Sequence, residues 1–384
     1  MFKTSYIELS ESAVKNNIDF IQNLLGEGVT FSSVVKGNAY GHGIEHYCPI
    51  AHKYGVRHFS VFSAGEALSV TKALPNHEFT LMIMGEIEND ELIWAIENDV
   101  EFYVFEQDRL DAAIATAKQM GKKVLIHVEL ETGMNRTGFP QKEIKAIFKK
   151  IEDNLDHVEV KGICTHFAGA ESIANYKRII NQFSRFKRYQ NKLNEFPWIK
   201  AKKHLASSAA SIRYPNSQMD LVRIGILQFG FFPTQEIYVN YTTKFKTRNN
   251  PLRPILSWKT KVMDVKKVKA GEFVGYGMSF FTNQATKIAL LPVGYSSGYS
   301  RSLSNQGKVL INGKRFNVIG TINMSMLAVD VSSDESIAKG DEVVLIGIQG
   351  DQELSVSSFS DFSQLINYEL LTRLPQNIPR IIAK

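Results

Sequence analysis

Several side chains that could do chemistry follow predicted strands of this sequence. Lys36 ends the apolar, β-branched run FSSVVK, and the segment GNAYGHG follows it directly. A lysine amine at the end of a strand can act as a nucleophile or form a Schiff base where its surroundings disfavour the ammonium form. Its usual pKa of about 10.4 otherwise keeps it charged, so a solvated surface lysine is the alternative interpretation. Polar side chains also follow other predicted strands: Glu129, Arg136, His166, Ser207, Ser208 and Arg223.

Two of these positions could contact an anion. The segment SSAAS (207–211) predicts the start of a helix, where backbone N–H groups face outward, and GIL (225–227) follows the last strand of the first half. Ordinary helix capping explains the serines equally well. The sequence contains no P-loop and no Rossmann glycine fingerprint, and no H-E-x-x-H or paired-cysteine pattern predicts a metal site.

The elements that would position these side chains alternate regularly. Short apolar strands separate amphipathic helical stretches such as DRLDAAIATAKQM, and eight evenly spaced βα units favour a (β/α)₈ TIM-type barrel over an open doubly wound sheet. In such a barrel the carboxyl ends of the strands form one rim, so the polar side chains should gather there. The predicted strands are 30–36, 57–62, 79–85, 100–105, 123–130, 157–167, 202–207 and 219–225.

A second domain follows the barrel. Long helical patterns largely stop after FFPTQ (231–235), and the chain then reads as strands and turns, such as KVLINGKRFNVIG with its NGK hairpin signal. We therefore predict an α/β fold with a barrel over 1–240 and a mostly-β domain over 241–384. The first dozen residues could join either domain, and QLINYELLTRL (364–374) predicts a short helix.

Composition excludes several classes of protein. The 384 residues are 44% hydrophobic, and the net charge is +6, from 45 basic and 39 acidic residues. The basic cluster SRFKRYQNK fits a solvated helix face better than a nucleic-acid patch, and a mild positive field also suits an anionic cofactor or substrate. No apolar run is long enough to span a membrane, and the first residues lack a signal-peptide layout. Only two cysteines, Cys48 and Cys164, indicate a reducing, cytoplasmic setting.

The segment VVKGNAYGHG (34–43) resembles the cofactor-lysine motif of alanine racemases, which are fold-type III enzymes dependent on pyridoxal phosphate. The resemblance covers nearly the whole chain. It implies a barrel followed by a β domain, and a head-to-tail homodimer whose active sites are shared between subunits. Further matching segments are ETGMNRTGF (131–139), THFAGAE (165–171), HLASSAA (204–210), LVRIGILQFG (221–230), VGYGMSF (274–280), PVGYSSGYSRSLSN (292–305), VIGTINM (318–324) and NYELLTRLPQNIPR (367–380).

The resemblance also implies site roles. Lys36 would hold pyridoxal 5'-phosphate as a Schiff base and exchange a proton on the face that handles the D-enantiomer, while Tyr276 of the other subunit would be the base for the L-enantiomer. Racemisation removes a proton from one face of the α-carbon and returns it to the other, which two bases on opposite faces can do. The resemblance therefore implies an amino-acid racemase, most simply of L-alanine and D-alanine. The other implied contacts are Tyr40, Ser208, Gly225 and Ile226 at the phosphate, Arg223 at the ring nitrogen, His166 beneath the cofactor, Arg136 and the Met324 N–H at the substrate carboxylate, and Tyr295 at the entrance.

Some positions depart from the family pattern. Glu129 stands where the family often has a carbamate-bearing lysine, and we expect it to pair with Arg136. Around the entrance, Ser297 and Ser325 replace acidic residues, and Gln376 falls near the expected phosphate contacts. These changes leave open serine or a bulkier amino acid as substrate, and also a degenerate, non-catalytic pyridoxal-phosphate-binding homologue. A carrier protein and a decarboxylase are weaker alternatives, because the former is generally a barrel alone and the latter would not need these motifs.

Overall fold

The computed structural model describes residues 3–247, 249–357 and 367–383, which form two compact units. The barrel unit consists of residues 13–36 and 47–253. The β unit combines residues up to Ser12, the segment Gly37–His46 and the chain from Pro254 onward. The predicted boundary between residues 240 and 241 stays a prediction. No helix in the described ranges has the length and apolar character needed to cross a membrane.

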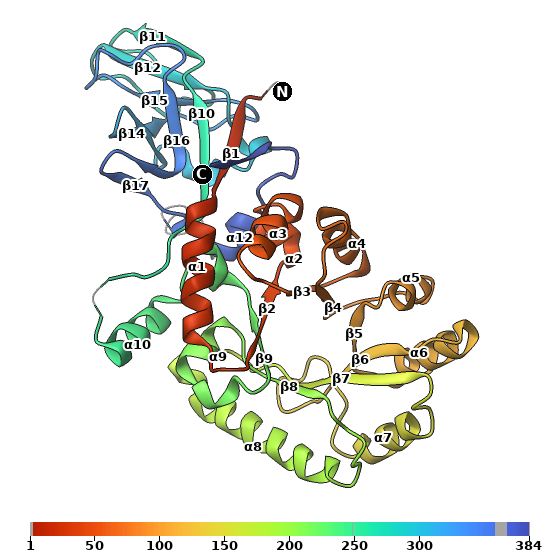
Figure 1. The fold of residues 1–384 in the computed structure, drawn as a ribbon. Helices are drawn as coiled ribbons and strands as arrows, with labels where there is room; N and C mark the ends of the chain where they lie inside the picture. The colour runs from red at the N-terminus through yellow and green to blue at the C-terminus, as the bar shows by residue number, and fades with distance from the viewer. Residues whose placement is uncertain (1–2, 248, 358–366, 384) are drawn as a thin grey trace. The chain divides into compact units, whose positions relative to one another are not determined.

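Eight parallel strands form the barrel unit, in the order β8-β7-β6-β5-β4-β3-β2-β9 (Figure 1). A bridge between Ser207 and Arg223, with the Arg223 N–H donating to the Ala206 carbonyl at 3.0 Å, joins β8 to β9 and closes the ring. The predicted (β/α)₈ architecture is confirmed. The strands are β2 (Thr30–Val34), β3 (His58–Val61), β4 (Thr80–Ile83), β5 (Glu101–Val104), β6 (Val124–Glu129), β7 (Val158–Cys164), β8 (Lys202–His204) and β9 (Leu221–Ile224).

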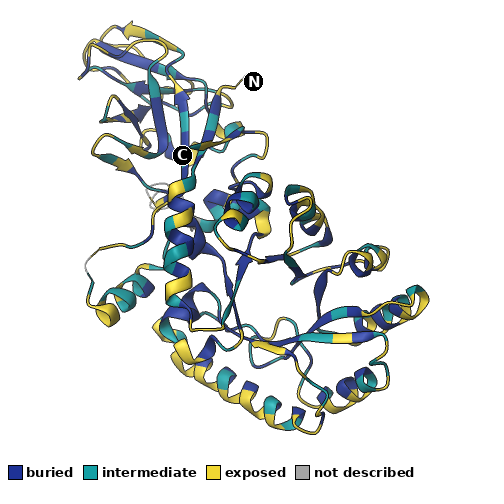
Figure 2. Ribbon diagram, viewed as in Figure 1, coloured by how far each residue is buried: buried dark blue, intermediate teal, exposed yellow. Residues whose placement is uncertain are grey.

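Helices surround these strands, and their polar faces point to solvent while most strand residues are buried (Figure 2). Helix α6 shows the local signals: the Glu106 carboxylate accepts from the N–H groups of Asp108 and Arg109 at its start, and Gly121 ends it at φ 62°. The helices are α1 (Glu11–Leu24), α3 (Ile44–Lys53), α4 (Ala64–Ala73), α5 (Glu91–Glu97), α6 (Gln107–Met120), α7 (Ile144–Glu152), α8 (Tyr176–Leu193), α9 (Ser208–Arg213) and α10 (Gln235–Phe245).

The β unit contains one mixed sheet in the order β11-β12-β15-β14-β13-β16-β10-β1-β18, with β17 paired to β16. The first residues join this unit, because β1 pairs with both β10 and β18. Asn312 and Gly313, at φ 49° and 73°, make the predicted β13–β14 hairpin turn. The strands are β1 (Ser5–Ser10), β10 (Leu256–Lys261), β11 (Asp264–Val268), β12 (Thr286–Leu291), β13 (Lys308–Ile311), β14 (Lys314–Ile319), β15 (Leu327–Asp330), β16 (Glu342–Gln349), β17 (Gln352–Leu354) and β18 (Arg380–Ala383).

Two segments from the resemblance motifs complete the β unit. Helix α12 (Asn367–Thr372) lies within the helix predicted over 364–374, of which residues 364–366 fall outside the described ranges. Within α2 (Lys36–Tyr40), Gly37, Asn38 and Ala39 have left-handed backbone angles, and Tyr40 follows at φ 51°. Gly41 continues this turn, and a β-carbon there would lie 1.9 Å from the Leu371 carbonyl oxygen, so only glycine fits.

Candidate active site

The carboxyl end of the barrel brings together four of the predicted site residues. Lys36 follows β2, Arg136 lies in the loop after β6, His166 follows β7 and Arg223 lies on β9. Their charges act on one another: Arg223, Arg136 and Lys36 all lower the pKa of His166, after burial as the largest cause, and bring it to about 3. The rim therefore carries the two permanently charged guanidinium groups of Arg136 and Arg223 beside the Lys36 amine and a neutral imidazole, an arrangement suited to an anion.

Lys36 has a weakened preference for its charged form. Its side chain is open to solvent, but its amine stands among other rim groups, and this partial desolvation is the largest cause that lowers its pKa. Arg136 and Arg223 lower the pKa further, while the Glu66 carboxylate opposes them. The amine thus has the larger neutral fraction that nucleophilic attack on an aldehyde requires.

Buried polar side chains fix the strand that ends at Lys36. The Gln228 side-chain oxygen accepts from Ser33 Oγ at 2.6 Å and from Tyr47 Oη at 2.9 Å. Its amide nitrogen donates to the carbonyls of Val34 at 2.8 Å and Ile224 at 3.1 Å, which ties β2 to β9. The network holds the base of Lys36 against the strand that carries Arg223.

The predicted contact between His166 and Arg223 is present, with Nη2 donating to the imidazole Nδ1 at 3.3 Å. The Arg223 guanidinium is buried and also donates to the carbonyls of Thr165, His204 and Leu205. A guanidinium held by several carbonyls cannot turn freely, so its free edge has a fixed direction.

Ser208, Gly225 and Ile226 lie together beyond β8 and β9, as the phosphate-site prediction requires. Ser207 is the N-cap residue of α9, and Ser208 is buried at its first position. The Gly225 N–H donates to Ser208 Oγ at 2.9 Å, and within the described chain the Ser208 hydroxyl has no acceptor for its own proton. That buried hydroxyl is available to an anion.

The predicted pairing of Glu129 with Arg136 is wrong. No ion pair joins the two side chains in the part of the chain that the structure describes. Glu129 is buried and hydrogen-bonds to Thr137, whereas Arg136 is exposed. Burial is the largest effect on Glu129 and raises its pKa, although both Arg223 and Arg136 oppose this. The carboxyl group therefore acts on Arg136 only through space.

Sequence reasoning missed a row of side chains on α8 that holds the loop of Arg136. Tyr189 Oη donates to the Glu131 carbonyl at 2.7 Å, Arg185 to the Thr132 carbonyl at 3.1 Å and Arg178 to the Gly133 carbonyl at 3.1 Å. Gln182, buried between them, donates to Thr132 Oγ1 and to the His166 carbonyl. Their spacing of three or four residues was the available signal, since it places them on one helix face.

The remaining predicted side chains lie in the β unit. The Tyr276 carbonyl accepts from Thr321 Oγ1 at 3.0 Å, and the N–H of Tyr295 donates to the Asn323 carbonyl at 3.1 Å. The Ser296 N–H and hydroxyl donate to the Met324 carbonyl. These bonds tie the three predicted loops together, yet Tyr276, Tyr295 and Met324 are 72%, 41% and 59% exposed.

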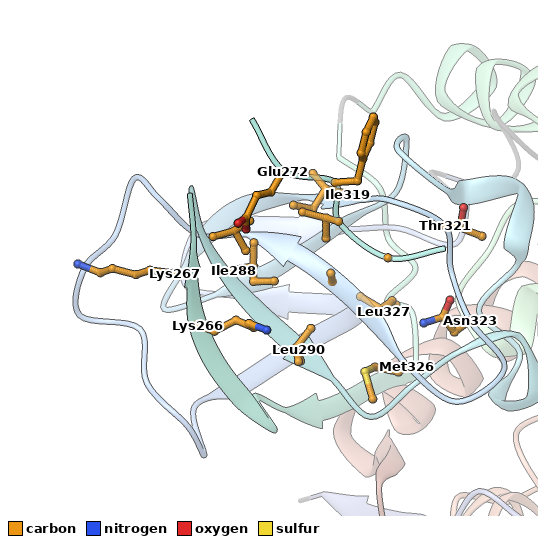
Figure 3. A pocket seen from close by; sticks show the side chains of 15 residues that line it. Lys266, Lys267, Glu272, Ile288, Leu290, Ile319, Thr321, Asn323, Met326 and Leu327 are labelled. Carbon is orange, nitrogen blue, oxygen red and sulfur yellow. The ribbon is translucent and has the colours of Figure 1, made fainter. Parts of the chain in front are cut away.

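A pocket of about 370 Å³ adjoins the Tyr276 loop within the β unit (Figure 3). Apolar side chains of β12 and β15 form its floor, and residues 272–275 form a wall that leads directly to Tyr276. Lys267 points away from it, whereas Thr321 and Asn323 stand at its other end (Figure 3). The surface beside the Tyr276 loop is thus hollowed, with an apolar floor and polar groups at its margins.

Tyr40 belongs to the left-handed turn of the β unit. Burial raises the pKa of its phenol to about 12, so the hydroxyl is a hydrogen-bond donor at neutral pH. The turn is held by Arg380, which donates to the Gly41 carbonyl at 2.8 Å. Such a phenol suits a phosphate oxygen.

Comparison with known proteins gives two family matches. Residues 9–233 match the family described as "Alanine racemase, N-terminal domain", and residues 255–382 match "Alanine racemase, C-terminal domain". The chain belongs to the alanine racemase family. This membership makes it an isomerase, an amino-acid racemase of the pyridoxal-phosphate-dependent class, and it confirms the resemblance noted in the sequence.

Named members of the family are similar to this chain over nearly its full length. The alanine racemase of Leptospira interrogans is 32% identical over 381 residues, which cover 99% of this chain and 96% of that protein. The structure of the Clostridium difficile 630 alanine racemase aligns with TM-score 0.90 and 27% identity, over 100% of this chain and 96% of that one. The alanine racemase from Bartonella henselae "with covalently bound pyridoxal phosphate" aligns with TM-score 0.84 and 25% identity over 100% of both chains.

The residues present at the barrel end fit pyridoxal phosphate. An aldehyde requires an amine with a lowered pKa, which Lys36 provides. A phosphate requires donors, which the buried Ser208 hydroxyl and the positive rim provide. A ring nitrogen requires a fixed polar partner, and Arg223 is a buried, firmly held donor.

Proposed function

We propose that this enzyme interconverts L-alanine and D-alanine by two-base proton transfer, with Lys36 and Tyr276 as the bases. The observation that carries the proposal is the Lys36 amine, whose pKa is lowered at a rim that also presents Arg136 and Arg223. Family membership supports the reaction class. Alanine is favoured over serine or a bulkier amino acid because the relatives are named alanine racemases.

The cofactor would be pyridoxal 5'-phosphate, held covalently by Lys36. When bound, it withdraws electrons from the substrate α-carbon and so acidifies the α-proton. Tyr40, Ser208 and the backbone at Gly225 and Ile226 would bind its phosphate. Arg223 would face its ring nitrogen, and His166 would lie beneath it. Because an arginine keeps its proton, Arg223 would leave that nitrogen unprotonated and limit side reactions.

The substrate would be held by its carboxylate. Arg136 offers the planar pair of donors that matches a carboxylate, and the Met324 N–H, which has no acceptor in the described chain, would add a further donor. Tyr295 would line the entrance. A substrate whose carboxylate is held by both donors would have a fixed orientation, so the α-hydrogen of each enantiomer would lie on one defined face.

Lys36 and Tyr276 would then exchange protons on opposite faces of the α-carbon. Tyr276→Phe removes the phenol while keeping the ring, and we expect it to abolish α-proton abstraction from L-alanine while α-proton exchange of D-alanine at Lys36 largely persists. Hydrogen–deuterium exchange of each enantiomer, measured separately, checks this. Equal losses for the two enantiomers would rule out this assignment of the bases.

The working form would be a homodimer with shared sites. The support is that Tyr276 is exposed in the single chain, whereas a catalytic base has to be shielded from solvent at the site. The apolar side chains Phe273, Met278 and Phe281 in the same segment are exposed as well. A second copy that covers this segment would bury Tyr276 at the site. The buried free thiols of Cys48 and Cys164 support a reducing, cytoplasmic setting.

The test uses purified protein loaded with pyridoxal phosphate in D₂O. A panel of L-amino acids is added, and loss of each α-proton signal is followed by NMR while chiral chromatography detects the D-product. We expect exchange and D-product with L-alanine. Exchange confined to serine or a bulkier amino acid would show that alanine is not the substrate. No exchange with any amino acid, despite bound cofactor, would favour a non-catalytic homologue.

A further inference from the structure

A chain of buried polar side chains crosses the barrel interior behind Arg223. Arg223 Nη1 lies 2.5 Å from His204 Nδ1, His204 Nε2 lies 2.8 Å from His127 Nδ1, and His127 Nε2 lies 2.7 Å from the Glu101 carboxylate. The exposed fractions of Arg223, His204, His127 and Glu101 are only 5%, 0%, 1% and 6%. The four residues come from β9, β8, β6 and β5, so no single element accounts for their alignment.

The two ends fix the direction of these hydrogen bonds. An arginine only donates, so His204 Nδ1 must accept, and its Nε2 must then carry the proton toward His127. The Glu101 carboxylate only accepts, so His127 Nε2 must donate and its Nδ1 is free to accept. Both imidazoles are therefore neutral and share one tautomer. Burial, the largest cause, lowers the pKa of both His127 and His204, in agreement with neutral rings.

Gly162 leaves the space that this chain needs. It lies on β7, between the strands of the two histidines, and a β-carbon there would lie 2.1 Å from His127 Nδ1 and 2.8 Å from His204 Nε2. Its φ lies outside the left-handed region, so the backbone does not require glycine. The position lacks a side chain because the hydrogen bond between the two imidazoles passes there.

Other nearby groups do not change this direction. His58 Nε2 lies 3.7 Å from the Glu101 carboxylate, and the Tyr103 ring lies 6.0 Å from each histidine ring. Burial is the largest effect on Glu101 and raises its pKa, but the hydrogen bond from His127 and the nearby His58 together outweigh it and lower the pKa, so the carboxylate stays ionised. In the described ranges, no group of three or more potential metal ligands is placed to bind a metal ion.

We propose that Glu101, His127 and His204 are positioning residues that orient the Arg223 guanidinium through a one-directional hydrogen-bond relay. If His204 carried its proton on Nδ1, it would present an N–H group to a cation, and the guanidinium would have to turn away. Glu101 prevents this because it accepts only from the matching tautomer of His127. The effect on catalysis rests on the proposed function, in which Arg223 faces the cofactor ring.

The first test is the tautomer itself, in cofactor-free protein labelled with ¹⁵N-histidine. We expect His127 and His204 to show protonated Nε2 and unprotonated Nδ1 throughout pH 5.5–8.5. In Glu101→Gln, whose amide can donate as well as accept, we expect the Nδ1–H form to become detectable in at least one ring. A wild-type ring that is cationic, or protonated at Nδ1, would overturn the relay whether or not the protein is a racemase.

The second test measures the effect on Arg223 in holoenzyme. We expect Glu101→Gln and Gly162→Ala to lower kcat about tenfold, as when the partner that orients a functional ligand is removed, with little change in KM and a shifted cofactor absorption band. Gly65→Ala is the control, because a β-carbon at Gly65 in α4 meets no atom within 4 Å. Unchanged kcat and absorption in both folded variants would overturn the positioning role. An inactive wild-type protein with the expected tautomers would instead refute the proposed function alone.

Discussion

Lys36 is the residue on which the proposed chemistry depends, because its amine would hold the cofactor. Lys36→Ala removes the amine, so borohydride reduction of protein incubated with pyridoxal phosphate should no longer fix the cofactor to a peptide containing position 36. Mass spectrometry of the reduced, digested protein measures this. Lys72→Ala, which changes an exposed lysine on α4, is the control and should label at Lys36 as the wild type does. Specific, stoichiometric labelling of another lysine in Lys36→Ala would show that the cofactor lysine is misassigned.

His42, also at the residue scale, gives the stability a pH dependence. It is fully buried, and burial lowers its pKa from 6.5 to about 4. Between these values the unfolded chain binds a proton that the folded chain does not, so stability falls as the pH drops through this window. At pH 5 the loss is about 2 kcal/mol from this one group. Urea unfolding at pH 7.5 and pH 5 should show a smaller difference for His42→Gln, whereas His77→Gln, at an exposed histidine, should leave it unchanged.

At the scale of elements, α8 acts as a support for the loop that presents Arg136. Tyr189→Phe deletes one hydrogen bond, to the Glu131 carbonyl, and should cost about 1 kcal/mol of stability. Because the loosened loop carries the proposed carboxylate arginine, KM should rise roughly threefold to tenfold while kcat changes little. Steady-state kinetics checks this. Arg188→Ala is the control: this residue is exposed on the same helix, and its replacement should leave both constants unaltered. A lower kcat with an unchanged KM in Tyr189→Phe would contradict the supporting role of α8.

The elements also show which parts of the structure a sequence reveals. The barrel could be predicted from the alternation of apolar strands and amphipathic helices, because the burial of each element requires a regular pattern of apolar residues in the sequence. The left-handed turn did not follow from the sequence, since Ala39 and Tyr40 have side chains that usually avoid positive φ. In the sequence, the residues of the proposed relay appear only as polar residues within apolar strands, such as Glu101 in EFYV and His127 in VLIHVE. Their pairing depends on strand register and on the space left at Gly162, which no local pattern encodes.

At the scale of the whole molecule, the proposed shared site has a direct consequence. Lys36 and Tyr276 would come from different subunits, so each site of a heterodimer of Lys36→Ala and Tyr276→Phe would draw one residue from each chain. One site would then contain both lesions and the other neither. Random reassociation of equal amounts gives half heterodimers, each with one intact site, so mixing two inactive proteins should restore about a quarter of wild-type activity.

The complementation assay distinguishes the shared site from a site built within one chain. The two variants are mixed, partly dissociated at low denaturant concentration and returned to buffer, and racemisation of L-alanine is measured with the dimer content checked by sedimentation. Each variant treated alone is the control and should stay inactive. If both residues acted within one chain, every chain in the mixture would carry a lesion in its own site. Heterodimers without recovered activity would therefore place the second base in the same chain as Lys36 or assign it to another residue, whereas recovery near one quarter requires that the dimer completes the site.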